Sequence, residues 1–185
     1  PNYHYTVSEL GGCPPMMPTD FSLLSIGYPA REECISLNQE RLSAEFLNHY
    51  EYIVINVLFS SYHIEHFERA INQIQAVSDA EIIVMGNFIE LNMDMAELVF
   101  LGIDPRLNPE TVNSFALFED ELRALSENHY SFISKKDFFC QGDDIRSCTM
   151  NFNGVPFSYD RHHLNIEAST AFSEYLVELS NGNFK

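Results

Sequence analysis

Residues 52–59 read YIVINVLF, a run in which almost every side chain is apolar and several are β-branched. This composition is typical of a strand buried on both faces, as strands of a parallel sheet are. A second run, IIVM at 82–85, stops at Gly86-Asn87. Amphipathic, helix-like segments lie between and after these runs. The alternation predicts an α/β fold with a mostly parallel sheet in one domain, residues 1–185.

Capping residues and apolar spacing predict where the helices begin. The expected starts are Ser36, Ser60 or Ser61, Asn108 and Asn165. The helix after Ser61 should turn Ile64, Phe67, Ile71 and Ile74 inward. The helix after Asn108 should turn Val112, Phe115, Phe118, Leu122 and Leu125 inward. Short strands are expected at 3–7 and 130–133, and a short helix at 95–101.

The charge balance narrows the choice of partners. The chain has a formal net charge of −17, with 10 Lys and Arg against 27 Asp and Glu. Such an excess of acid argues against nucleic acid and against anionic membrane surfaces as partners. It also serves solubility. The sequence contains no signal peptide and no apolar run long enough to cross a bilayer.

The four cysteines lie in loop-like segments and form no C-x-x-C pair, which disfavours a zinc ribbon or a thioredoxin-type site. Cys140 and Cys148 bracket a short polar loop, and Cys13 and Cys34 flank a Pro-rich segment. We predict the disulfides 13–34 and 140–148 and hence an oxidising compartment. Four free thiols in a cytosolic protein are the alternative interpretation.

Residues 159–165 read YDRHHLN, which places Asp160 three residues before His163. At this spacing a carboxylate can orient an imidazole, and the imidazole can take a proton from a hydroxyl nucleophile. A structural loop contact is the alternative, because acid–histidine pairs are also common outside active sites. His162 is interpreted as a surface residue or a substrate contact.

Other side chains admit a functional interpretation that we consider weaker. His63 and His66 share a helix face, but the sequence offers no third ligand at a useful spacing, so we expect a solvated face and no metal site. Ser60 and Ser61 are interpreted as a helix cap in preference to a substitute nucleophile. Loop tyrosines can line a glycan groove, although most aromatic residues should belong to the core; the candidates are Tyr28, Tyr62 and Tyr159.

Several pieces, in this order, resemble the SGNH-hydrolase-like domain at the C-terminus of membrane acyltransferases of the acyltransferase-3 family, which include O-antigen acetylases. They are Gly12-Cys13-Pro14-Pro15, the runs 52–62 and 82–87, Cys140 with Cys148, Gly154-Val155-Pro156-Phe157 and the stretch 159–165. The resemblance covers essentially the whole chain. It implies a three-layer α/β/α sandwich of flavodoxin-like type.

The resemblance also implies roles for residues and for partners. His163 would be the general base, Asp160 its orienter and Asn87 an oxyanion-hole side chain. The domain would lie on the periplasmic face, tethered to the inner membrane. It would transfer an acetyl group to a sugar hydroxyl of a surface polysaccharide, without a cofactor of its own. The acyl donor would come from the parent's membrane domain.

One feature of the family's pattern is absent. The family's nucleophile is the serine of a Gly-Asp-Ser motif on its first strand, and this sequence contains no Gly-Asp-Ser; Gly142-Asp143-Asp144 is its nearest string. We expect that the motif and the first strand have been trimmed, which would leave this piece inactive and a sheet edge open to self-association. The alternatives are a non-catalytic module that binds the glycan acceptor and a stand-alone carbohydrate esterase.

Overall fold

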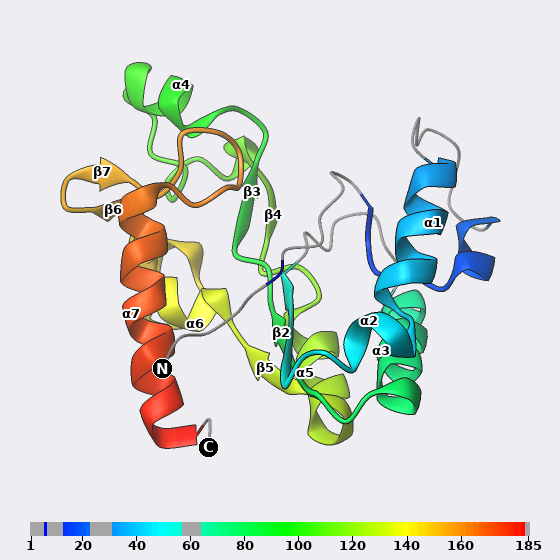
Figure 1. The fold of residues 1–185 in the computed structure, drawn as a ribbon. Helices are drawn as coiled ribbons and strands as arrows, with labels where there is room; N and C mark the ends of the chain where they lie inside the picture. Colours follow the sequence, from blue (N-terminus) through cyan, green and yellow to red (C-terminus); the bar gives the residue numbers. More distant parts are fainter. Residues whose placement is uncertain (1–5, 7–12, 23–30, 57–63, 184–185) are drawn as a thin grey trace. The chain divides into compact units, whose positions relative to one another are not determined.

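The computed structural model describes residues 6, 13–22, 31–56 and 64–183, which belong to two compact units (Figure 1). The first unit comprises residues 1–57, 61–84 and 120–132. The second comprises residues 58–60, 85–119 and 133–185. Among the described helices, none has the length and apolar character needed to cross a membrane.

Three strands form the main sheet, in the order β1-β2-β5. They are β1 (Tyr52–Asn56), β2 (Glu81–Met85) and β5 (Ser131–Ile133). Helices α3 (Ile64–Val77) and α5 (Glu119–His129) alternate with them along the chain. The predicted α/β fold with a mostly parallel sheet is thereby confirmed.

Helix α3 follows its predicted pattern except at its first residue, Ile64, which is only half-buried. Phe67, Ile71 and Ile74 are spaced by three or four residues and are all buried, as are Ile82, Ile83 and Val84 of β2. This shared burial makes the core of the first unit.

The prediction that the first strand is buried on both faces is wrong. Along β1, exposed and buried residues alternate, with Tyr52 44% and Val54 53% exposed while Ile55 is buried. β1 is the outer strand in the order of the described sheet, and the side chains of Tyr52 and Val54 point to a face that the described residues leave open. Residues 57–59 of the predicted strand lie outside the described residues, as does the strand expected at 3–7 apart from residue 6.

The predicted helix start at Ser36 is also wrong. Helix α1 (Arg31–Arg41) already contains Ser36, because the arginine and glutamates before it are good helix formers. A different serine does the capping: the Ser43 hydroxyl accepts the backbone N–H of Phe46 at 3.2 Å and begins α2 (Ala44–Leu47).

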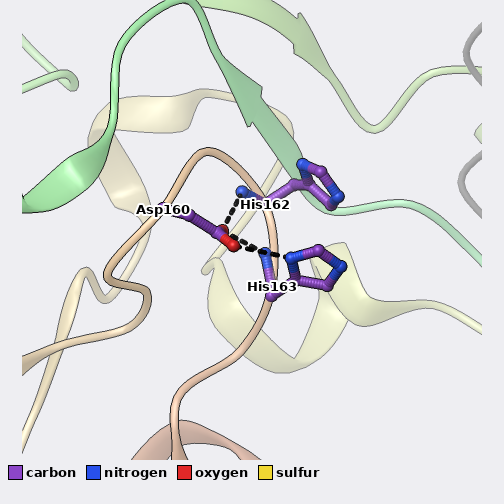
Figure 2. Close-up of side chains that lie close together, drawn as sticks. All are labelled: Asp160, His162 and His163. Carbon is purple, nitrogen blue, oxygen red and sulfur yellow. Dashed lines mark hydrogen bonds and ion pairs between the residues drawn. The ribbon is translucent and has the colours of Figure 1, made fainter.

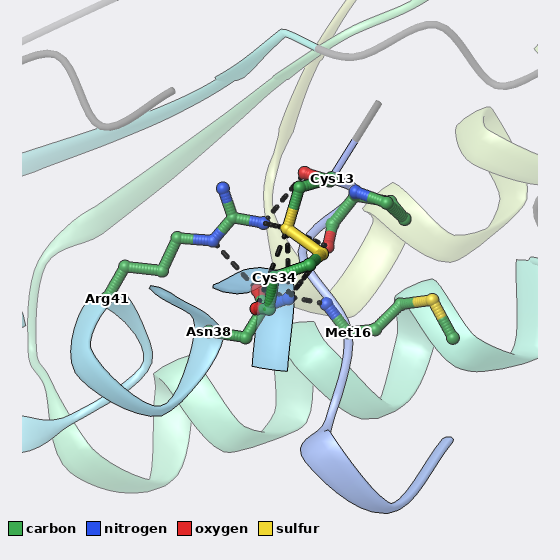
Figure 3. Close-up of a disulfide and its surroundings, with 6 residues drawn as sticks. Cys13, Met16, Cys34, Asn38 and Arg41 are labelled. Atoms are coloured by element: carbon green, nitrogen blue, oxygen red, sulfur yellow. Dashed lines mark hydrogen bonds between the residues drawn. A yellow bond between two sulfur atoms is a disulfide. The ribbon is translucent and has the colours of Figure 1, made fainter. Parts of the chain in front are cut away.

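The predicted disulfide between Cys13 and Cys34 is present and fixes the Cys-Pro-Pro turn to α1 (Figure 3). Asn38, which is fully buried, lies beside it and donates its side-chain N–H to the Pro14 carbonyl at 3.1 Å. Arg41 donates to the Asn38 side-chain oxygen at 2.8 Å and to the Cys13 carbonyl at 2.9 Å. These bonds, followed by the 3₁₀ turn η1 (Pro18–Ser22), hold a segment that lacks other regular structure.

In the second unit, β3 (Ile89–Leu91) pairs antiparallel with β4 (Val112–Phe115), with Ile89 opposite Phe115. The helix predicted after Asn108 is therefore wrong in its first half, where a 3₁₀ turn η2 (Pro109–Thr111) leads into β4. The pairing with β3 overrides the helical spacing of Val112 and Phe115. The helical half, α5, starts only after Ala116 and Phe118, whose φ angles are 45° and 63°.

An aromatic cluster forms the core of the second unit. The Phe88 ring stacks on Phe139 with centroids 4.2 Å apart and meets Phe157 edge-on at 5.4 Å. The elements around it are α4 (Met95–Phe100), α6 (Lys135–Phe139), the 3₁₀ turn η3 (Ile145–Ser147), the hairpin β6 (Asn151–Phe152) and β7 (Val155–Pro156), and α7 (Ile166–Asn183). The second predicted disulfide, Cys140–Cys148, is present and closes the loop around η3.

Candidate functional site

The structure places the side chains of Asp160 and His163 in direct contact. Both lie on the loop between β7 and α7, and His163 Nδ1 donates to Asp160 Oδ2 at 2.6 Å (Figure 2). Because a carboxylate only accepts, this bond keeps the proton of a neutral imidazole on Nδ1 and leaves Nε2 as its basic nitrogen. The His163 side chain is 73% exposed, so Nε2 is accessible to a hydroxyl group.

The second oxygen of Asp160 is held by its own loop. Oδ1 accepts the backbone N–H groups of His162 at 3.0 Å and His163 at 2.9 Å, and the Ser158 hydroxyl at 3.1 Å. Partial burial raises the pKa of Asp160, but these donors and the His163 side chain lower it more, so that the pKa lies well below its usual range. Asp160 is thus a fixed carboxylate.

Backbone hydrogen bonds from β3 and α4 hold the other side of this loop. Arg161 and Asp94 add an ion pair at 3.6 Å. The backbone N–H groups of Leu91, Met95 and Ala96 donate to loop carbonyls. Their acceptors are Arg161 at 2.9 Å, Asp160 at 3.0 Å and Tyr159 at 3.2 Å, respectively. The first-turn N–H groups of a helix have no partner within the helix, so the loop carbonyls satisfy them.

Asn165 closes the loop on its C-terminal side. As predicted, its side-chain oxygen caps α7 by accepting the Ala168 N–H at 2.8 Å. Its backbone N–H donates to the Phe157 carbonyl at 2.8 Å, and its side-chain N–H donates to the Pro156 carbonyl. The Asp160–His163 pair therefore sits on a segment anchored at both ends.

Sequence reasoning missed Ser158 as part of the site. This serine is fully buried, and its hydroxyl accepts the Asp160 N–H at 3.1 Å while lying 3.1 Å from Oδ1. The spacing of Ser158 and Asp160 could have predicted this contact, because a serine hydroxyl often hydrogen-bonds the backbone two residues further on and so closes a local turn.

His162 packs against His163, with ring centroids 4.1 Å apart. Its Nδ1 is buried, and among the described residues it has no hydrogen-bond partner. Asp160, His162 and His163 each offer a ligand atom within 4.8 Å of the others. However, Asp160 is already bound to His163 and to the backbone, so the arrangement favours an oriented imidazole over a metal site.

Asn87 lies at the carboxyl end of β2. It is buried and follows Gly86, whose N–H donates to the Ile133 carbonyl of β5 at 2.9 Å. From Asn87 the chain runs through β3 to Leu91, whose backbone N–H holds the Asp160–His163 loop. The four residues from Asn87 to Leu91 span roughly 13 Å when extended. An oxyanion donor must reach within about 3 Å of the reacting oxygen. The role of Asn87 therefore stays a prediction.

The remaining candidates divide into two groups. His66 is buried, with Nδ1 3.7 Å from Asp20, so the prediction of a solvated face is wrong for this residue; Asp20 also pairs with Arg69 at 3.1 Å. Tyr159 is 62% exposed beside Asp160. The others lie outside the described residues: Tyr28, Ser60, Ser61, Tyr62 and His63.

Comparisons with known proteins point to one family. The family described as "SGNH domain (fused to AT3 domains)" matches residues 2–178. No curated protein sequence matches the chain. Among solved structures, the periplasmic domain of the lipopolysaccharide acetyltransferase of Salmonella ser. Paratyphi A is similar, with a TM-score of 0.65 and 17% identity over 91% of this chain and 69% of that chain. Since the family match spans nearly all of its length, this chain belongs to the SGNH domains that are fused to AT3 domains.

Proposed function

We propose that this domain serves O-acetyl transfer to a sugar hydroxyl of a surface polysaccharide, with His163 as the general base and Asp160 as its orienting carboxylate. The observation that carries the proposal is the 2.6 Å bond from His163 Nδ1 to Asp160 Oδ2 on a doubly anchored loop. Membership of a family fused to AT3 domains and the fold shared with an acetyltransferase domain support it.

The proposed chemistry runs through an acyl-serine. His163 Nε2 takes the proton of a serine hydroxyl, the serine oxygen attacks the carbonyl carbon of the acyl donor, and the leaving group departs with that proton. The sugar hydroxyl then gives its proton to His163 and attacks the acyl-serine. The serine oxygen recovers the proton as it leaves. Atoms and charges balance without a cofactor.

This sequence lacks the motif that carries the family's nucleophilic serine. It contains no Gly-Asp-Ser, so we propose that a serine elsewhere in the intact protein acts as the nucleophile, and that these 185 residues alone are inactive. Replacing the serine of a Gly-Asp-Ser motif in the intact protein by alanine should abolish acetylation of its polysaccharide. The measurement is acetyl transfer with and without that serine. Hydrolysis of acetyl esters by the 185-residue chain, dependent on His163, would contradict the proposal.

The proposed location is the periplasmic face of the inner membrane. Two disulfides fit an oxidising compartment, and the similar solved structure is itself described as a periplasmic domain. A membrane-embedded acyltransferase part of the same protein would tether the domain and deliver the acyl group. The acceptor would be a sugar of an O-antigen polysaccharide.

A non-catalytic glycan-binding module is the second candidate, favoured by the missing Gly-Asp-Ser motif. In that role the exposed Tyr159 ring would stack on a sugar beside the Asp160–His163 loop. The serine experiment separates the two functions, because a module without covalent chemistry would tolerate the loss of the serine of a Gly-Asp-Ser motif.

We also propose that β1 provides an edge for self-association. It is the outer strand of the described sheet, and two of its own side chains, Tyr52 and Val54, are exposed. We expect a concentration-dependent rise in solution mass for the 185-residue chain, and Val54→Lys should suppress it by placing a charge on the exposed strand. A clean monomer at all concentrations would count against this contact.

A further inference from the structure

The outer end of α4 carries an unusual concentration of exposed apolar side chains. Met95 and Leu98 face the core and are buried, whereas the following residues are turned outward. The exposed fractions are 51% for Val99, 88% for Phe100, 52% for Leu101 and 71% for Leu107. Single exposed apolar residues are ordinary, but three consecutive ones at a helix end, with Leu107 six residues further along the chain, are typical of an interaction surface. We call these four residues the α4 patch.

The backbone fixes the end of the helix that bears this patch. The Ile103 N–H donates to the Leu98 carbonyl at 2.9 Å, and the Gly102 N–H donates to the Val99 carbonyl at 3.1 Å. Gly102 has a φ of 69°, the left-handed conformation that such a helix end requires. Ile103 then packs against the aromatic core. Phe100 is thus exposed on a helix end whose backbone is held by hydrogen bonds.

The charges around the α4 patch are predominantly negative. The arginines nearby are already paired, Arg106 with Asp104 at 2.6 Å and Arg161 with Asp94 at 3.6 Å. Two exposed glutamates lie close to the patch in the chain: Glu97 within α4, and Glu110 three residues after Leu107. A surface that complements the patch is therefore apolar at its centre and basic at its rim.

The α4 patch and the proposed catalytic pair share one short helix. The first turn of α4 holds the Asp160 and Tyr159 carbonyls, while its last turn bears Val99 and Phe100. A six-residue helix is about 9 Å long. A partner bound at the patch would lie next to the loop that carries His163.

We propose that the α4 patch docks onto the membrane-embedded acyltransferase part of the same protein, on a surface with an apolar centre and a Lys/Arg rim. This rests on the proposed function, in which that part delivers the acyl group. An anionic lipid surface is disfavoured because it would repel Glu97 and Glu110. A second copy of the domain is disfavoured because a symmetric contact would bring the same glutamates together.

A photoreactive benzophenone side chain placed at position 100 of the intact protein, in native membranes, tests the proposal. On irradiation we expect a crosslink within the same polypeptide, mapped by mass spectrometry to the membrane-embedded part. The same probe at position 177, a 59% exposed valine of α7, serves as the matched control. Crosslinks to lipid, crosslinks to a second copy, or a yield equal to that at position 177 would each overturn the proposal.

Two further variants separate docking from chemistry. Phe100→Ser combined with Leu107→Ser should lower polysaccharide acetylation at least tenfold without changing the folding of the domain, and Val177→Ser should leave acetylation unchanged. His163→Ala should leave the crosslink from position 100 intact. If position 100 gives no crosslink although the protein still acetylates its polysaccharide, docking of the α4 patch is contradicted and the proposed function is not. If the crosslink forms but His163→Ala still acetylates the polysaccharide, the proposed function is contradicted and docking is not.

Discussion

Replacing His163 by alanine in the intact protein is expected to abolish acetyl transfer, by about 10³-fold or more, because the serine then has no base at hydrogen-bonding distance. His163 is the group whose Nε2 faces outward while Nδ1 is held by Asp160 at 2.6 Å. The acetyl content of the polysaccharide and the rate of transfer from the acyl donor both report the loss.

The same variant should fold normally. The His163 side chain is 73% exposed, and substitutions at such positions usually change the free energy of unfolding by no more than about 0.5 kcal/mol. Urea unfolding of the domain therefore distinguishes lost chemistry from lost structure. His49→Ala, at an exposed histidine of the first unit, is the control and should keep full transfer. Transfer near the wild-type rate in His163→Ala would remove His163 from the mechanism.

The elements that could be predicted from the sequence are those whose signal is local. The inward face of α3 and the buried β2 follow directly from their apolar spacing. The contact between Asp160 and His163 spans three residues and needs only a tight loop, and the Asn165 cap needs only the helix that follows it. The disulfides also followed from loops that bring their cysteines together.

The features that escaped prediction depend on partners far away in the chain. Val112 and Phe115 have helical spacing, but pairing with β3 makes them a strand. His66 looked solvated, but Asp20, 46 residues away, lies 3.7 Å from its Nδ1, and Arg69 contacts the same nitrogen at 2.6 Å. The anchoring of the Asp160–His163 loop uses backbone N–H groups of β3 and α4, which leave no trace in residue identities.

Replacing Asp160 by asparagine is expected to reduce transfer by roughly 10³–10⁴-fold, although the side chain keeps its shape. The amide can still accept the N–H groups of His162 and His163 through its oxygen. Its NH₂ group, however, would then face the Nδ1–H of His163, where two donors cannot bond. The imidazole must move its proton to Nε2, and that nitrogen then cannot accept the proton of a serine.

The tautomer of His163 gives this prediction a direct readout. We expect ¹⁵N chemical shifts with the proton on Nδ1 in the wild-type domain and on Nε2 in Asp160→Asn. The control is Asp120→Asn, at an exposed position of α5, which should change neither the shifts nor transfer. An Asp160→Asn protein that keeps the Nδ1 proton and full transfer would show that the carboxylate does not orient the base.

The pH dependence of the pair follows from the sign of the Asp160 shift. The pKa of this carboxyl is lowered in the folded domain, so its stabilising contribution is fully present above the unfolded value of about 3.9 and disappears only as the pH falls through the lower folded value. The Nδ1 bond to His163 should therefore persist, by NMR, down to about pH 4. A bond already lost between about pH 5 and 6 would mean that Asp160 is not the fixed carboxylate that its hydrogen bonds to His162, His163 and Ser158 require.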